Sequence, residues 1–159
     1  MPLKEYKDKR RFDTTPEPAA EVVQRQGRDF VIQRHQASHL HWDLRLEDGG
    51  VLKSWAVTKE PPAEPGVKRL AVQVEDHPFD YKDFEGTIPE GEYGAGTVEI
   101  WDSGTYLPLL EGEPDSSVAE AIARGALKFR LEGKRLEGNY FLYHFDKKGK
   151  NWFFFKMKH

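Results

Sequence analysis

Between Phe30 and Met157 the chain contains eight short segments in which apolar and polar residues alternate or apolar residues run together. Alternation with a period of two is typical of strands that bury one face, and Gly, Pro and charged residues separate the segments as turns do. The pattern therefore predicts a mainly β protein, a closed or nearly closed antiparallel β-barrel. The segments are FVIQ (30–33), HWDLRLE (41–47), VLKSWAV (51–57), LAVQVEDH (70–77), GTVEIW (96–101), ALKFRLE (126–132), NYFLYHF (139–145) and WFFFKM (152–157).

One or two short helices are expected beside the barrel. Thr15 and Pro16 followed by AAEVVQRQ and Gly27 resemble a helix with proline near its start and glycine at its end. A second helix is expected where Ser117 and Glu120 form a capping box and Gly125 ends the segment.

The first eleven residues form a basic arm, rich in Lys and Arg. Composition favours a disordered arm, although it could also fold over a phosphate-bearing ligand. We expect a single domain over residues 1–159, with the arm and short helix at 1–28 and the barrel at 29–159.

Composition narrows the function classes. The 159 residues are 38% hydrophobic and 13% aromatic, which favours a globular domain. A net charge of −3 provides no global basic field, so nucleic-acid binding would need a local patch. The absence of cysteine excludes disulfides and thiol catalysis, and no long apolar run predicts a membrane span. A cytoplasmic protein without a membrane partner is the expectation.

The run RHQASHLHWDLRLE indicates a metal site. In an extended strand His41, Asp43 and Arg45 project from one face, and the apolar residues between them project from the other. A hairpin turn at 36–39 would bring His35 back to His41. Two imidazoles and a carboxylate can bind Mn²⁺, Zn²⁺ or Fe²⁺ and leave coordination positions open. His39 has the same parity but lies in the turn, either as a supporting donor or simply solvated.

Other residues are candidates for acid–base chemistry and phosphate binding. Glu75 and His77 are expected to share a strand face with Gln73, and His77, at a strand end, could act as acid or base at a barrel mouth or be structural. Tyr93, in the glycine-rich turn GTIPEGEYGAG, could stack on a sugar or base. A phosphate clamp could be formed by Arg45, Ser54, Lys59 and Arg69.

Five strings together closely resemble the 3′-phosphoesterase module of bacterial DNA ligase D and its free-standing relatives: KRRFDTTPEP, RHQASHLHWDLRLE, LKSWAV, KRLAVQVEDHPFDY and FEGTIPEGEYGAG. The resemblance covers nearly the whole chain. It implies a β-barrel enzyme, typically dependent on Mn²⁺, with Zn²⁺ or Co²⁺ as alternatives. Such an enzyme removes a 3′-terminal ribonucleoside and then the 3′-phosphate from a primer strand, leaving a 3′-hydroxyl for DNA repair and end joining.

The resemblance also implies roles for individual residues. The metal ligands would be His35, His41 and Asp43; the catalytic residues would be Arg45, Glu75, His77 and Tyr81; and nucleic-acid or phosphate contacts would come from Arg45, Ser54, Lys59, Arg69, Arg10 and Glu17. Arg11 and His144 depart from the family pattern, in the arm and in a late strand. The implied partner is the 3′ end of a DNA or RNA-terminated primer-template, with a separate ligase or polymerase, because a stand-alone module is expected.

Two alternatives remain open from sequence. A non-haem iron oxygenase would pair His41 and Asp43 with His77 or His144. A non-catalytic single-strand-binding barrel would use Trp42, Tyr81 and Tyr93 for base stacking, although the alternation places Trp42 in the core.

Overall fold

The computed structural model describes residues 2–110 and 117–159. Within them the helical segments are α1 (Lys4–Asp8), a 3₁₀ turn (Phe79–Asp83) and α2 (Val118–Arg124). The strands are β1 (Asp29–Gln36), β2 (Leu40–Asp48), β3 (Val51–Val57), β4 (Lys68–Pro78), β5 (Gly86–Ile88), β6 (Gly96–Pro108), β7 (Ala126–Gly133), β8 (Glu137–His144) and β9 (Asn151–Lys156).

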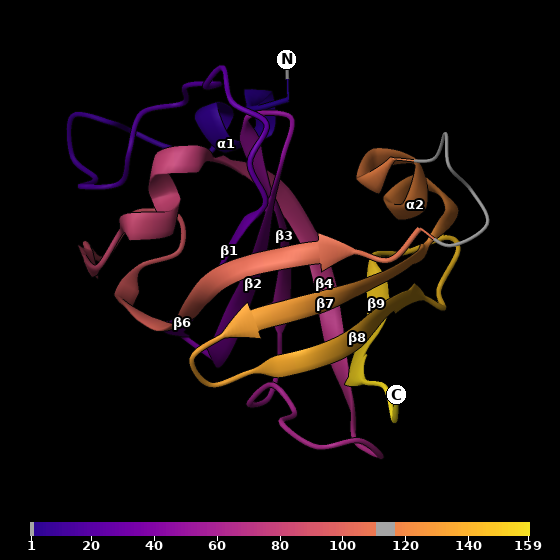
Figure 1. The fold of residues 1–159 in the computed structure, drawn as a ribbon. Helices are drawn as coiled ribbons and strands as arrows, with labels where there is room; N and C mark the ends of the chain where they lie inside the picture. The colour runs from indigo at the N-terminus through magenta and orange to yellow at the C-terminus, as the bar shows by residue number, and fades with distance from the viewer. Residues whose placement is uncertain (1, 111–116) are drawn as a thin grey trace.

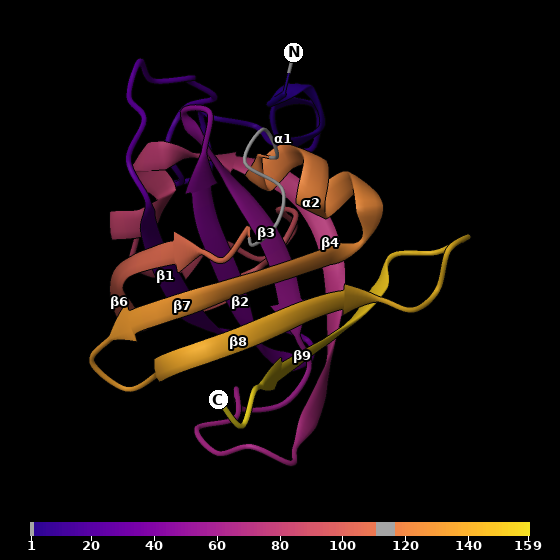
Figure 2. The same cartoon turned by 45° about the vertical axis from the view of Figure 1, so that its right-hand side comes forward.

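Eight of these strands close into an antiparallel barrel. The order is β1-β2-β3-β4-β9-β8-β7-β6, and pairing of β1 with β6 completes the ring (Figures 1 and 2). The short strand β5 adds to β6 outside the ring. Each of the eight segments expected from sequence is a barrel strand, so the predicted fold class is confirmed. Strand β5, only three residues long, carries too little pattern to be found from sequence.

The barrel interior is the main hydrophobic core, and every barrel strand contributes to it. Trp42, Leu44 and Leu46 of β2 lie in this core, as the alternation predicts. Trp55 and Trp152 pack edge to face inside it, with ring centroids 5.5 Å apart. Because one face of β2 is used for packing, its alternate residues Asp43 and Arg45 face outward.

A second, smaller core lies on the outer face of the barrel, where α1 and the 3₁₀ turn cover the sheet (Figure 1). Its buried residues are Tyr6, Leu52, Tyr81, Phe84, Ile88 and Val98. α1 and the 3₁₀ turn therefore cover the outer face of β1–β4 and shield it from solvent. His77 lies beneath this cover, in contact with the rings of Tyr6 and Tyr81. The expectation that it lies at a barrel mouth is therefore wrong.

The first predicted helix is wrong and the second is correct. Residues 19–26 are not helical; their backbone runs along the barrel, where the amide of Val23 donates to the carbonyl of Gly50. Arg25 also pairs with buried Glu47 from β2. These contacts with the barrel replace the internal hydrogen bonds of a helix. In α2 the hydroxyl of Ser117 accepts from the amide of Glu120, and Gly125 ends the helix at φ +82°.

The N-terminal arm is ordered, contrary to the composition-based expectation. It contains α1, in which Tyr6 is buried and donates from its hydroxyl to the carbonyl of Pro18. A short apolar anchor is therefore enough to hold a mostly charged segment on the barrel. Among the described helices, none has the length and apolar character needed to cross a membrane.

Candidate functional site

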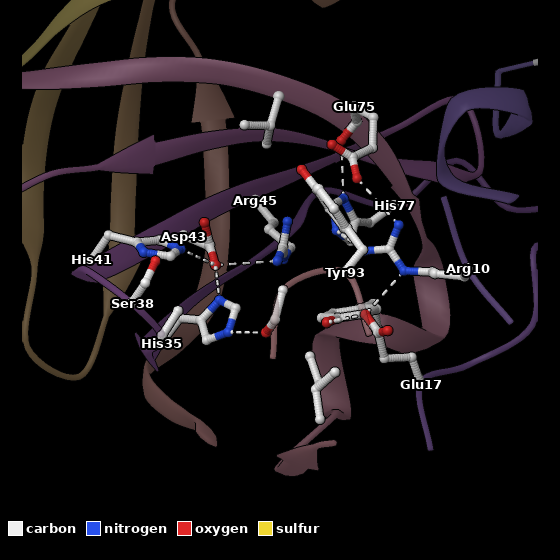
Figure 3. A pocket seen from close by; sticks show the side chains of 15 residues that line it. Arg10, Glu17, His35, Ser38, His41, Asp43, Arg45, Glu75, His77 and Tyr93 are labelled. Carbon is white, nitrogen blue, oxygen red and sulfur yellow. Dashed lines mark hydrogen bonds and ion pairs between the residues drawn. The ribbon is translucent and has the colours of Figure 1, made fainter. Parts of the chain in front are cut away.

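The β1–β2 hairpin brings two histidines and an aspartate together. His35 and His41 are direct partners in the strand register, with ring centroids 4.7 Å apart. The carboxylate of Asp43 lies between them, with Oδ2 3.5 Å from Nδ1 of His35 and 3.3 Å from Nε2 of His41 (Figure 3). One ligand atom from each residue lies within 4.8 Å of the others. The predicted metal-ligand set is thus assembled at one point.

Backbone carbonyls fix the orientation of both imidazoles. Nε2 of His35 lies 2.7 Å from the carbonyl oxygen of Gly94, and Nδ1 of His41 lies 2.9 Å from that of His39. Because a carbonyl only accepts, these ring nitrogens carry protons, and the opposite nitrogens, which face Asp43, are the ones that would bind a metal. The donor set fits a divalent transition metal. His39 therefore contributes through its backbone.

The charges around Asp43 favour its ionised form. Burial alone would raise the pKa of this carboxyl, but Arg45 and the two histidines outweigh burial and hold the pKa well below its usual range. Burial would lower the pKa of His41, but Asp43 outweighs it and the pKa is raised. The ionised carboxylate of Asp43 is the form that binds a cation, and a metal that binds here would displace the proton that Asp43 favours on His41.

Arg45 lies beside the three candidate metal ligands, and its guanidinium is held by neighbouring side chains. Its Nε donates to Oε1 of Gln33 at 2.7 Å, its Nη2 lies 3.4 Å from Oδ2 of Asp43, and its guanidinium lies 4.8 Å from the centre of the Tyr81 ring. Nη1 is buried and has no hydrogen-bond partner within the described residues. A buried charged donor without a partner is costly, so an anion bound here would stabilise it.

Gln33 was missed by sequence reasoning. Its amide nitrogen donates to the carbonyls of Tyr81 and Phe84, which leaves its oxygen directed at Arg45. The signal was present, because Gln33 has the same strand parity as His35 and is a polar residue in an apolar strand. Gln33 positions the guanidinium.

A bulge in β4 aims three residues at the pocket. Ser54 pairs with Val74 and Leu52 pairs with His77, so β4 has one extra residue in this interval. Val74, Glu75 and His77 consequently all line the pocket. The prediction that Gln73 shares their face is wrong: its side chain accepts a hydrogen bond from the indole of the core residue Trp152.

His77 is a buried, neutral imidazole. Its Nδ1 lies 2.9 Å from the carbonyl of Glu75, and Nε2 lies 3.5 Å from Nη2 of Arg10, which can only donate. Burial, together with the cations Arg45 and Arg10, lowers the pKa of His77 well below its usual value. The ring is held edge to face by Tyr6 and Tyr81. In the free protein its Nε2 is therefore a proton acceptor.

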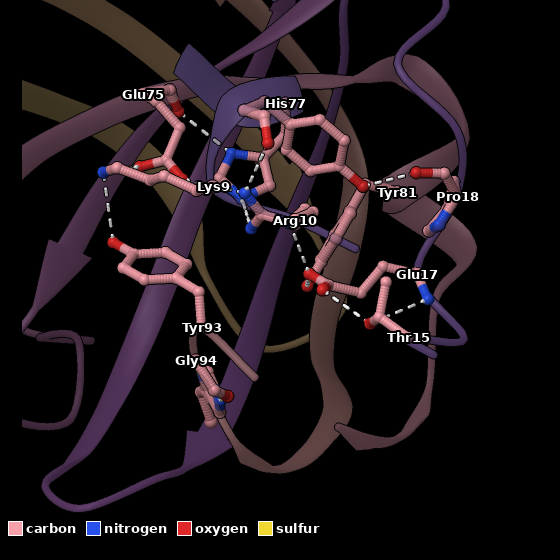
Figure 4. Close-up of polar contacts among 12 residues, drawn as sticks. Lys9, Arg10, Thr15, Glu17, Pro18, Glu75, His77, Tyr81, Tyr93 and Gly94 are labelled. Atoms are coloured by element: carbon pink, nitrogen blue, oxygen red, sulfur yellow. Dashed lines mark hydrogen bonds and ion pairs between the residues drawn. The ribbon is translucent and has the colours of Figure 1, made fainter. Parts of the chain in front are cut away.

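The arm inserts Arg10 into the pocket. This side chain is only 4% exposed and pairs with Glu17 at 3.0 Å and with Glu75 at 3.2 Å (Figure 4). The hydroxyl of Tyr81 donates to Glu17 at 2.7 Å, and burial raises the pKa of this tyrosine well above its usual value. Glu75, Glu17 and Tyr81 thus form the frame that holds the guanidinium of Arg10.

Arg11, the departure in the arm, turns the other way. It is exposed and pairs with Glu92 at 3.0 Å, and it also donates to the carbonyl of Gly91. The network around Arg10 is formed without it. His144, the second departure, lies outside the site, where it stacks on Trp152 and contacts the carbonyl of Gly149.

The pocket encloses about 220 Å³ and joins the metal-ligand group to the Arg10–His77 group, with Arg45 between them (Figure 3). Tyr93 stands at its edge, 47% exposed, with Nζ of Lys9 3.3 Å from its hydroxyl. Ser54 is buried 3.4 Å from Nδ1 of His77 and does not line the pocket. Lys59 and Arg69 do not line it either: Lys59 is exposed, and Nε of Arg69 donates to the carbonyl of Glu60.

Fold and site together define a class of protein: an antiparallel β-barrel whose outer face carries a candidate metal centre beside a pocket that contains two buried arginine side chains. A family model for the DNA ligase D 3′-phosphoesterase domain matches residues 33–144. The chain belongs to this family, whose name supports a hydrolase that acts on phosphoester bonds.

Curated relatives agree with this assignment. The chain is 48% identical to the multifunctional non-homologous end joining protein LigD of Pseudomonas aeruginosa over 99% of its length, and 44% identical to that of Mycolicibacterium smegmatis over 98%. The non-homologous end joining DNA repair protein LigD of Mycobacterium tuberculosis is also 44% identical, over 98% of the chain. The chain spans about a fifth of the length of these relatives, 19 to 20%.

Proposed function

We propose that this chain is a metal-dependent phosphoesterase that heals 3′ ends of DNA or RNA-terminated DNA. It removes a 3′-terminal ribonucleoside and then the remaining 3′-phosphate, and leaves a 3′-hydroxyl that a polymerase or ligase can use. The proposed cofactor is Mn²⁺, with Zn²⁺ or Co²⁺ as alternatives, held by His35, His41 and Asp43. Family membership supports the reaction class, and the relatives support a role in repair by end joining.

The unpartnered Nη1 of Arg45 is the observation that carries this proposal. It lies in a pocket whose other cation, Arg10, is also buried, and both guanidinium groups flank the imidazole of His77. A planar guanidinium with a free donor matches a phosphate oxygen, and the low exposure of the site strengthens that attraction. A neutral ligand would form a weaker hydrogen bond with Nη1, because a charge-assisted hydrogen bond to a phosphate oxygen is the stronger of the two.

The side chains divide the work as follows. Bound Mn²⁺ would supply Lewis-acid polarisation of the phosphoryl group. Arg45 binds a phosphate oxygen and offsets the charge that develops in an in-line displacement. Glu75 and Tyr81 act through Arg10, since the carboxylate of Glu75 and the Tyr81–Glu17 pair hold its guanidinium.

His77 provides the proton chemistry. Its neutral state in the free protein follows from burial and from the two cations beside it. A phosphate bound against Arg45 and Arg10 would offset their charge, so substrate binding raises the proton affinity of the imidazole. Once Nε2 has taken up a proton from solvent in the substrate complex, His77 would donate it to the departing sugar oxygen, or hydrogen-bond to that oxygen in the transition state, while water attacks the phosphorus in line.

Lys59 and Arg69 do not line the pocket, and their proposed role is at its rim. Val57, the last residue of β3, pairs with Trp42 beside His41, so the segment that carries Lys59 leaves the sheet at the metal-ligand end. A terminal phosphate monoester has one more negative charge than a diester, and rim cations serve this extra charge most.

Neither alternative is favoured by the geometry. His41 and Asp43 gather with His35 rather than with His77 or His144, as the oxygenase hypothesis would require. Of the aromatic residues proposed for base stacking at this site, Trp42 is in the barrel core and Tyr81 is buried, which leaves only Tyr93 exposed.

The test is a 5′-labelled primer that ends in one ribonucleotide with a 3′-phosphate, annealed to a template and incubated with the protein and each of several divalent metals. We expect three successive products, ending in a ribonucleotide 3′-hydroxyl, a deoxynucleotide 3′-phosphate and a deoxynucleotide 3′-hydroxyl, and no product with excess chelator. The Arg34→Gln variant is a matched control, because Arg34 lies beside His35 on the opposite strand face and pairs with Glu99. An unchanged primer with every metal would refute the proposal.

A further inference from the structure

The outer face of β4, β9, β8 and β7 carries a row of side chains that the pocket does not use. Lys68 pairs with Phe155, Phe155 with Phe141, and Phe141 with Lys128. Direct cross-strand partners project from the same side of a sheet, so these four residues form one line across four strands. Their neighbours along the strands, such as Phe154 and Phe129, fill the barrel interior, so the line faces outward.

The row combines flat rings with cations. Phe141 and Phe155 lie edge to face with centroids 5.5 Å apart. Nζ of Lys68 is 5.4 Å from the centre of the Phe155 ring, and Nζ of Lys128 is 5.3 Å from that of Phe141. The row lines a groove of about 600 Å³, together with Met157 and Lys158. None of the described residues that line this groove is acidic.

The apolar surface continues beyond the groove. The next cross-strand line contains Leu70, Phe153 and Tyr143, of which Tyr143 is 47% exposed. Phe145 follows and stacks on Phe153 at a centroid distance of 4.1 Å. Contiguous exposed apolar surface of this kind commonly marks a binding site.

This face lies on the other side of the barrel from the pocket. In the ring of eight strands, β8 is four strands away from β2 in either direction (Figure 2). We propose that it is a second nucleic-acid site, where bases of a single strand stack on Phe141 and Phe155 and the backbone phosphates meet Lys68 and Lys128.

The lysines of the groove favour a single-stranded nucleic acid as its ligand. The chain as a whole is acidic, yet this groove gathers lysines around aromatic rings. Sequence-tolerant single-strand binding uses this combination, because every base has a flat face and every nucleotide carries a phosphate. An apolar protein partner would match the rings but not the lysines. The inference is independent of the chemistry proposed for the pocket.

The test measures fluorescence anisotropy of a 5′-labelled single-stranded oligonucleotide with a 3′-hydroxyl end, in the presence of chelator. The double variant Phe141→Leu/Phe155→Leu should weaken binding by about tenfold or more, since stacking on both rings is lost. Lys68→Gln/Lys128→Gln should reduce the slope of log K against log salt by about 1.4, or about 0.7 for each phosphate contact. The charge-matched control Lys82→Gln/Lys134→Gln, which alters lysines away from the groove, should leave both quantities near wild type.

Affinity and salt slope that equal the control in both double variants would overturn the proposal. So would dimerisation in sedimentation experiments that the phenylalanine variant abolishes while DNA binding is unchanged, because the face would then serve self-association. Thermal unfolding of each variant verifies the fold. The lysine variant keeps the aromatic packing and gives an independent answer if the phenylalanine variant unfolds.

Discussion

The side-chain oxygen of Gln33 accepts a 2.7 Å hydrogen bond from Nε of Arg45. Because the amide of Gln33 is anchored on two backbone carbonyls, this bond fixes the guanidinium and leaves Nη1 free for a ligand. We expect Gln33→Leu to lower kcat/KM by about 10- to 100-fold, since a hydrogen bond to a charged group is worth about 1.5–3 kcal/mol.

Steady-state kinetics on the primer substrate checks this prediction, with Mn²⁺ affinity as a second readout. Metal binding should stay close to wild type, because Gln33 does not touch the ligand group. Wild-type kinetics in Gln33→Leu would show that the orientation of Arg45 does not matter.

Removal of a metal ligand should affect both reactions together. His41→Ala or Asp43→Ala deletes one of three donors that meet at one point. We expect a loss of more than about 100-fold in both the diesterase and the monoesterase steps, and a fall of Mn²⁺ affinity by at least about tenfold, as is usual even for groups that only support a ligand. Isothermal titration calorimetry and the gel assay measure the two effects; full activity of either variant would remove the metal site as described.

The pH behaviour of His77 depends on its cationic neighbours. Burial comes first among the causes that lower its pKa, followed by Arg45 and Arg10. Arg10→Gln removes one positive charge, so the protonated imidazole becomes less unfavourable and the pKa should rise towards its usual value of about 6.5. NMR titration of the His77 ring protons should show a higher midpoint in the variant, and a lower or identical midpoint would contradict the electrostatic account.

The lowered pKa of His77 also makes the free energy of unfolding depend on pH. An unfolded chain binds a proton at this histidine as the pH falls below about 6.5, whereas the folded protein leaves it neutral. The contribution of His77 to the free energy of unfolding is therefore complete above that pH and decreases as the pH falls below it. Urea denaturation as a function of pH should show a smaller acid-side loss in His77→Asn than in wild type.

Lys59 and Arg69 should affect removal of the 3′-phosphate and removal of the ribonucleoside to different extents. Lys59→Gln and Arg69→Gln are expected to reduce 3′-phosphate removal more than ribonucleoside removal, by about tenfold in the ratio of the two kcat/KM values, because the monoester has the greater charge. Separate time courses on a diester primer and on a pre-formed 3′-phosphate primer give that ratio. An equal reduction of both would assign these residues to general strand binding.

The alternation of apolar and polar residues predicted the barrel strands and the β1–β2 hairpin that carries the candidate metal ligands. The period of two places Trp42 in the core and Asp43 outside, and the short turn after β1 brings His35 to His41; both follow from strand geometry alone. The capping box of α2 is likewise a local signal.

Tertiary contacts decided the features that sequence reasoning missed. The arm looks disordered by composition, but burial of Tyr6 and the pairing of Arg10 with Glu75, 65 residues away, order it. The β4 bulge that turns Val74 towards the pocket has no signature in the alternation, which is why Gln73 was misplaced. The carbonyl of Gly94 orients His35, and no backbone oxygen can be recognised from residue type.

The most direct measurement is X-ray diffraction from crystals soaked in Mn²⁺, with data collected at the manganese absorption edge. The account predicts one strong anomalous peak between Nδ1 of His35, Nε2 of His41 and the carboxylate of Asp43, and its loss in crystals of Asp43→Ala. An anomalous peak elsewhere, or none between these three side chains at saturating metal, would contradict it.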